Sequence, residues 1–198
     1  MLLRPLEKQF EAKTVKKIRE QIESFRNLNL PGGPCHYYVI EIMRALEAGL
    51  LLAAIELSAS LLELSLRELV FFNREKSVIS DHEFGPFLGK LARRFDLEYE
   101  RNMMFTQLMD ELESTGFASH NDTESIKRFY KETRIPIHHG LSGRYVAKSQ
   151  ECPSGDFFSV LSSTSIHSFE DALEKNTLDD LRLVTSFLSK FYGKRSEA

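Results

Sequence analysis

Apolar side chains recur with a helical period near the start of the chain. One apolar stripe, with members three or four positions apart, predicts a first helix of about 20 residues. Its members are Val15, Ile18, Ile22 and Phe25. The segment 27–34 (Asn-Leu-Asn-Leu-Pro-Gly-Gly-Pro) should end this helix, because Asn, Gly and Pro favour turns.

The longest apolar segment predicts a second helix over about 38–72. It contains no proline, and its only glycine is Gly49. A large apolar residue returns every seven positions, at Leu50, Leu57, Leu64 and Phe71. Over 48–62 nearly every face of this helix would be apolar. A helix without a polar face is buried on several sides. We therefore expect the central helix of a bundle, with part of it facing a second subunit.

Shorter helices should follow this one. A polar loop is expected over 73–81, then helices over about 87–95 and 97–115. Gly116 suits the end of the latter, because glycine readily adopts the left-handed conformation that closes many helices.

The pair Asn121 and Glu124 resembles a capping box at the start of the next helix. That helix carries Ile126, Phe129 and Tyr130 on its apolar face. Pro136 should kink or end it, because proline lacks an N–H and its ring clashes with the preceding turn.

The last part of the chain predicts a long loop followed by helices. Ser and Thr are frequent over 142–168, where we expect a loop with a small hairpin. Ser168 and Thr177 have the pattern of N-caps for the final helices, over about 168–193, because Asp171 and Asp180 lie three residues after them. We expect one all-α domain over 1–198 with five to seven helices.

Composition narrows the class of protein. The chain of 198 residues is 42% hydrophobic and 28% charged, with a formal net charge of −3. These values exclude a disordered chain and argue against a general nucleic-acid coat. Cys35 and Cys152 cannot build a disulfide framework, and the chain has no CxxC pair, so we expect reduced thiols in a cytoplasmic protein with no metal or other cofactor. The apolar run 48–55 is shorter than the roughly 20 residues of a membrane span, so no membrane partner is expected.

One segment departs from the acidic average. Residues 126–148 carry six basic residues and one acidic residue, a net charge of +5 before histidine is counted. Lys127 and Lys131 are four positions apart and share a helix face. Together with Arg144, they are candidates to bind an RNA backbone, because contacts of Lys and Arg with phosphate drive such binding. The alternative is a solvated basic helix face.

The same segment contains Arg134-Ile-Pro-Ile-His138-His139-Gly140. An arginine can clamp a phosphate with its planar guanidinium, and a histidine can exchange protons near neutral pH. Together they could cleave a phosphoester without a metal, with the ribose 2′-hydroxyl of RNA as the nucleophile. On a straight helix His138 shares a face with Arg134, whereas His139 is turned by about 100°.

This arrangement resembles the HEPN superfamily (higher eukaryotes and prokaryotes nucleotide-binding). Its hallmark is an arginine followed after four to six residues by a histidine and often a glycine, which correspond to Arg134, His139 and Gly140. The helix over 49–69, rich in small residues and ending in Glu63 and Arg67, is also similar to a helix of that family. The resemblance covers about 38–146.

The resemblance implies a four-helix up-and-down core that dimerises, so that two copies of the motif meet. Many members are metal-independent endoribonucleases of toxin–antitoxin, defence or RNA-processing systems, and their cleavage leaves a 2′,3′-cyclic phosphate. The implied partners are RNA, a second copy of the chain, and an antitoxin or nucleotidyltransferase. The implied catalytic residues are Arg134 and His139, with His138 as partner or substitute.

Two positions differ from active members, and an alternative stays open. Ile135 stands where a polar residue often follows the arginine, and Leu141 stands where some toxins carry tyrosine. The alternative is a non-catalytic HEPN-like binding or partner module, in which Arg134 pairs with a carboxylate such as Glu63 and the histidines satisfy backbone groups freed by Pro136.

Overall fold

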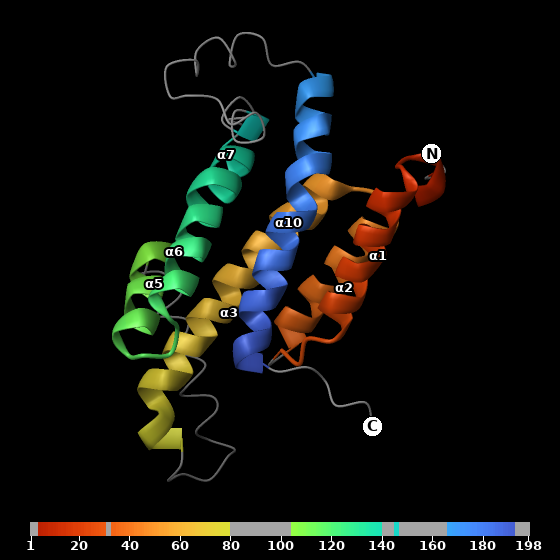
Figure 1. Cartoon of the computed structure of the whole chain (residues 1–198). Coiled ribbons are helices and arrows are strands. Elements are labelled where there is room, and N and C mark those ends of the chain that lie inside the picture. The colour runs from red at the N-terminus through yellow and green to blue at the C-terminus, as the bar shows by residue number, and fades with distance from the viewer. Residues whose placement is uncertain (1–3, 31–32, 80–103, 140–144, 147–165, 193–198) are drawn as a thin grey trace, which may run out of the picture. The chain divides into compact units, whose positions relative to one another are not determined.

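The computed structural model describes residues 4–30, 33–79, 104–139, 145–146 and 166–192 (Figure 1). Every regular element within these ranges is helical, as the sequence predicts. The elements, in chain order, are η1 (Leu6–Lys8), α1 (Ala12–Arg26), α2 (Gly33–Glu47), α3 (Leu51–Ile79), α5 (Phe105–Ser114), α6 (His120–Phe129), η3 (Tyr130–Arg134), α7 (Ile135–His138) and α10 (Ile166–Tyr192). Among the described residues, none of the helices combines the length and the apolar character needed to cross a membrane.

The chain divides into two compact units. The first comprises 1–62 and 128–198, and the second comprises 63–127, so that α3 begins in the first unit and ends in the second. The organisation of 1–198 as one domain stays a prediction.

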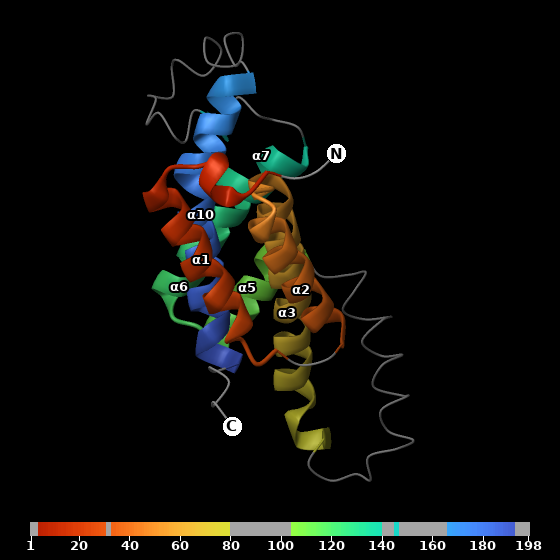
Figure 2. The ribbon, with the colours of Figure 1, turned by 90° about the vertical axis from the view of Figure 1, so that its right-hand side faces the viewer.

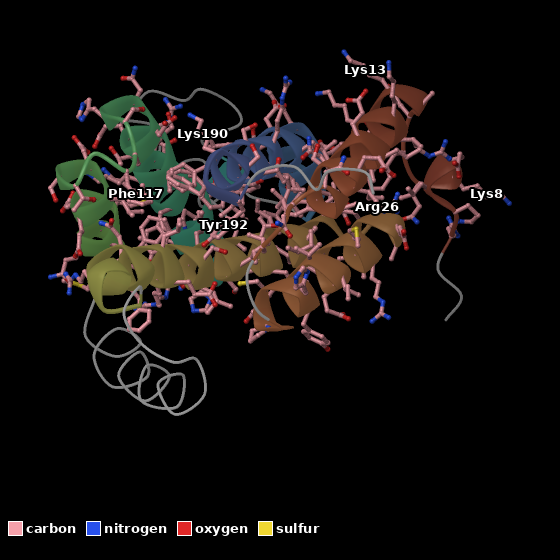
Figure 3. The ribbon with its side chains drawn as sticks, turned by 90° about the horizontal axis from the view of Figure 1, so that it is seen from below. Lys8, Lys13, Arg26, Phe117, Lys190 and Tyr192 are labelled. Carbon is pink, nitrogen blue, oxygen red and sulfur yellow. The ribbon has the colours of Figure 1, made fainter. Side chains whose placement is uncertain are left out.

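Helix α1 organises the first unit. It packs against both α2 and α10, and Figures 1 and 2 show it running beside them. The predicted stripe Val15, Ile18, Ile22 and Phe25 is buried. Lys13, in contrast, points away from the helices around it (Figure 3). The amphipathic pattern thus places the apolar side of α1 in the core.

The predicted helix over 38–72 is in fact two helices, separated at Gly49. Gly49 has a positive φ of 74°. Its N–H donates to the carbonyl of Leu46 at 3.0 Å, and the N–H of Leu50 donates to the carbonyl of Ala45 at 2.8 Å. These two bonds form a Schellman motif, which satisfies the last carbonyls of α2 and reverses the chain. The core role of the apolar segment is correct, since most of Leu51–Leu62 is buried or half-buried.

The expected polar loop over 73–81 is also wrong for its first part, because α3 continues to Ile79. The polar residues after Phe72 include Arg, Glu and Lys, which are good helix formers, and no Gly or Pro interrupts them. The predicted helix over 87–95 lies outside the described residues.

In the second unit, α5 and α6 are joined by a tight turn. The described part of the helix predicted over 97–115 is α5, which begins at Phe105 after the extended residue Met104, with ψ of 154°, and 97–103 lie outside the described residues. Gly116 closes α5 as predicted, with φ of 72°. The start of α6 differs from the prediction: Ser119 rather than Asn121 caps it, and the N–H of Asp122 donates to the Ser119 hydroxyl at 3.3 Å.

Polar contacts tie the helices of this second unit together. Arg74 of α3 donates through two nitrogens to the Glu111 carboxylate of α5. The Thr123 hydroxyl of α6 donates to Glu113 at 2.5 Å. This bond, together with the one from His120, lowers the pKa of the Glu113 carboxyl below its ordinary value.

The C-terminal helices predicted over 168–193 are one uninterrupted helix, α10. Neither Ser168 nor Thr177 is an N-cap, because both lie inside it. Thr177 is buried, and its hydroxyl lies beside the side chain of Tyr145 instead of capping a helix. The stripe of Leu181, Val184 and Leu188 is buried as predicted.

Candidate functional site

The arginine–histidine motif lies on a helix that changes its winding. Pro136 is predicted to kink or end the helix. It does not end the helix, which continues to His138. Before the proline, Tyr130–Arg134 forms a π-helical turn, and the N–H of Ile135 donates to the carbonyl of Tyr130, five residues back. Proline has no N–H to donate to the carbonyl four residues earlier. In the π turn before it, the backbone bond instead spans five residues.

A buried polar network holds this turn against α10. The Thr133 hydroxyl donates to Oδ2 of Asp180 at 2.8 Å, and both side chains are buried. One turn earlier on α10, the Thr177 hydroxyl lies 3.3 Å from the hydroxyl of Tyr145. Burial raises the pKa of Tyr145 above its ordinary value, and Asp180 adds to the shift. The Tyr145 hydroxyl therefore stays protonated, and its role is to stabilise the core through its contact with Thr177.

Arg134 follows Thr133 and is half-buried. Its guanidinium carbon lies 5.0 Å from the centroid of the Tyr130 ring, one turn back. This is a cation–π distance, at which the ring face attracts the charge. The contact restricts the arginine side chain and limits the directions in which its N–H groups can point.

His138 and His139 end the helix, and both are exposed. Their ring centroids lie 5.2 Å apart, with an interplanar angle of 81°. Nδ1 of His138 lies 3.8 Å from Oε2 of Glu56 on α3. Both imidazoles can therefore be reached from solvent, and one of them faces a carboxylate.

The predicted RNA-binding residues have different surroundings. Lys127 pairs with Asp110 at 2.8 Å and with Glu124 at 3.2 Å. These contacts, led by the hydrogen bond with Asp110, raise the pKa of Lys127. Lys131 is exposed, and Arg144 lies outside the described residues. Lys127 belongs to the second unit, whereas Lys131 belongs to the first.

Three residues near the motif were missed by sequence reasoning. Tyr130 was noted only as an apolar position and Asp180 only as a helix-capping residue. Glu56 has no predicted role, although it is the acid that directly follows the apolar run 48–55. An acid in such a run is a usable signal, since a carboxylate at the edge of a core requires a polar partner.

A metal site in the described part of the chain would require a group of ligating side chains. No three His, Cys, Asp or Glu side chains there are grouped so that they could hold a metal ion. The adjacent imidazoles and Glu56 instead suit proton transfer, and Arg134 suits the binding of an anion.

Comparison with known proteins identifies no relative. No family model matches the sequence, and no curated protein or solved structure is significantly similar to it.

Proposed function

We propose that this chain is a HEPN-like helical protein that acts as a metal-independent endoribonuclease. In this proposal a four-helix up-and-down core spans about 38–146, and two copies of the chain form the active assembly. Arg134 binds the scissile phosphate and His139 transfers protons, with His138 beside it. The basic residues that guide the RNA backbone are Lys127, Lys131 and Arg144.

The observation that carries the proposal is the placement of the motif side chains. Two exposed imidazoles lie side by side at the end of a helix, one turn after a half-buried arginine. A site for phosphoester cleavage requires a cation near the phosphate and a proton-transfer group that the substrate can reach. An arginine restrained by the Tyr130 ring is better prepared for the first role than a freely rotating one.

The chemistry restricts the substrate to RNA. A proton leaves the ribose 2′-hydroxyl as its oxygen attacks the phosphorus, and the bond to the 5′-oxygen breaks. A second proton transfer to the 5′-oxygen completes the step and leaves a 2′,3′-cyclic phosphate. Arg134 stabilises the negative charge that accumulates on the phosphate oxygens.

The basic residues contribute unequally in this proposal. Lys127 is paired with Asp110 and Glu124, so RNA phosphates would compete with two carboxylates for it. Lys131 is exposed, and we expect it to contribute more to RNA binding.

The experiment is an RNA cleavage assay in EDTA with end-labelled single-stranded RNA. We expect the wild-type protein to cut RNA, and Arg134→Ala and His139→Ala to lose at least about 100-fold in rate. Arg26→Ala and His120→Ala are matched controls, because both side chains are exposed and lie outside the motif. A 2′-deoxy substitution at the cleaved nucleotide should abolish cutting there.

Equal behaviour of all five proteins would overturn the proposal. RNA binding without cutting, weakened by Lys131→Ala, would favour the non-catalytic binding module instead. Circular dichroism of each variant confirms that the fold is retained.

A further inference from the structure

Glu56 is the one acidic residue within the apolar start of α3, between Leu51 and Leu62. Its neighbour Ile55 is buried, whereas the Glu56 side chain is 34% exposed and faces His138. The two residues come from helices far apart in the sequence. The nearby imidazole gives this partly buried carboxylate a polar neighbour in addition to water.

We propose that Glu56 is a positioning residue that selects the Nδ1–H tautomer of His138 and so makes its Nε2 the general base of the reaction. Among the two ring nitrogens, Nδ1 is the one that lies 3.8 Å from the carboxylate. A carboxylate only accepts hydrogen bonds, so it favours the proton on the nitrogen that faces it. The other nitrogen then has a free lone pair. This inference rests on the proposed function.

The distance is longer than that of a formed hydrogen bond. Catalytic hydrogen bonds are often long without substrate and shorten when it binds. His138 is at a helix end and its side chain is 54% exposed, so the surface leaves its ring space to turn toward Glu56.

The assignment divides the chemistry between the two histidines. Nε2 of His138 takes the proton of the 2′-hydroxyl, and the 2′-oxygen forms its bond to phosphorus. The bond from phosphorus to the 5′-oxygen breaks, and a protonated His139 gives its proton to that oxygen. One imidazole gains a proton and the other loses one, and exchange with water restores both. Within the described ranges, a carboxylate faces His138 and none is paired with His139, and this difference provides the asymmetry.

The first measurement reads the tautomer directly and needs no RNA. Two-bond ¹H–¹⁵N spectra of the full chain at about pH 8, where neutral imidazole predominates, should show His138 mainly as Nδ1–H. In Glu56→Ala it should revert to the Nε2–H form that isolated histidine prefers. Glu47→Ala, which removes an exposed glutamate from α2, is the matched control. His138→Ala assigns the signal.

The second measurement is kinetic. We expect Glu56→Ala to lower kcat for RNA cleavage by about 10- to 100-fold, as the removal of an orienting partner does elsewhere, with little change in KM. Glu56→Ala should cause no further loss in a His138→Ala background, because its effect runs through that imidazole.

The outcomes separate this inference from the proposed function. An Nε2–H tautomer of His138 in the wild type overturns the role of Glu56, even if the protein cuts RNA. Additive losses of Glu56→Ala and His138→Ala overturn it as well. An Nδ1–H tautomer without any RNA cleavage supports the orienting contact and overturns the proposed function, together with the base role of His138.

Discussion

At the scale of single residues, the hydrogen bond between Thr133 and Asp180 connects the motif segment to α10. Thr133 lies inside the π turn, immediately before Arg134, and Asp180 is a carboxylate with 8% of its surface exposed. A buried charge is tolerated only where hydrogen bonds replace water. The bond therefore contributes to stability and also fixes the backbone from which Arg134 extends.

We expect Asp180→Ala to lower the free energy of unfolding by about 2–3 kcal/mol, because it removes a carboxylate that accepts a hydrogen bond from the buried Thr133 hydroxyl. Thr133→Val should cost about 1–2 kcal/mol, and the double variant should lose less than the sum of the two. Urea unfolding followed by circular dichroism measures all three. Additive losses would show that the two side chains do not interact in solution.

The candidate site was predictable from the sequence only where its residues are local. Arg134, His138 and His139 lie within six positions, so their types and spacing indicate the chemistry directly. Glu56 and Asp180 join the motif through contacts between distant segments. Those contacts depend on which faces of α3 and α10 turn toward it, and a single sequence does not contain that information.

At the scale of elements, two glycines decide where helices end. Gly49 and Gly116 both have positive φ, 74° and 72°, and both follow a helix. Their surroundings differ. A Cβ on Gly49 would lie 2.6 Å from Oε1 of Gln9 and 2.9 Å from the ring of Phe10, whereas a Cβ on Gly116 would meet nothing within 4 Å.

The matched substitutions Gly49→Ala and Gly116→Ala should therefore lower the free energy of unfolding by different amounts. Gly116→Ala should cost about 1 kcal/mol from backbone strain alone, because an L-residue is disfavoured at positive φ. Gly49→Ala adds a clash with Phe10 and Gln9 to the same strain, so we expect a loss of about 2–3 kcal/mol. The midpoints and slopes of urea unfolding curves give the free energy of unfolding of each variant. An equal cost would mean that the N-terminal segment moves aside freely.

Gly49 also explains why the sequence predicts helix boundaries less well than helix content. A glycine inside an apolar run is compatible with a continuous helix at a cost of about 1 kcal/mol. It is equally compatible with a Schellman turn, and in the turn formed here a Cβ at position 49 would clash with Gln9 and Phe10. Polar residues after Phe72 likewise suit a loop or an exposed helix, so the sequence pattern alone does not choose between them.

At the scale of the whole molecule, we expect the proposed dimer to form through the exposed side of α2 in the first unit. Tyr37 is 64% exposed and Ile40 is 42% exposed, and their spacing of three residues places them on one face. Beside them, Arg44 and Glu41 form an ion pair at 2.7 Å. In a two-fold arrangement of two α2 helices, each arginine can pair with the glutamate of the other copy, so the surface is complementary to itself.

We expect the wild-type chain to be a dimer at micromolar concentration, and Tyr37→Glu with Ile40→Glu to shift it to a monomer, because the variant places like charges in a desolvated contact. Phe117→Glu is the matched control: Phe117 is also 42% exposed, but it belongs to the second unit and should leave the mass unchanged. Light scattering after size exclusion gives the mass. RNA cleavage by the monomeric variant indicates whether one copy of Arg134 and His139 suffices. A wild-type monomer that cuts RNA would remove the dimer from the proposal and leave the chemistry intact, whereas a dimer unaffected by the α2 variant would move the contact to another face.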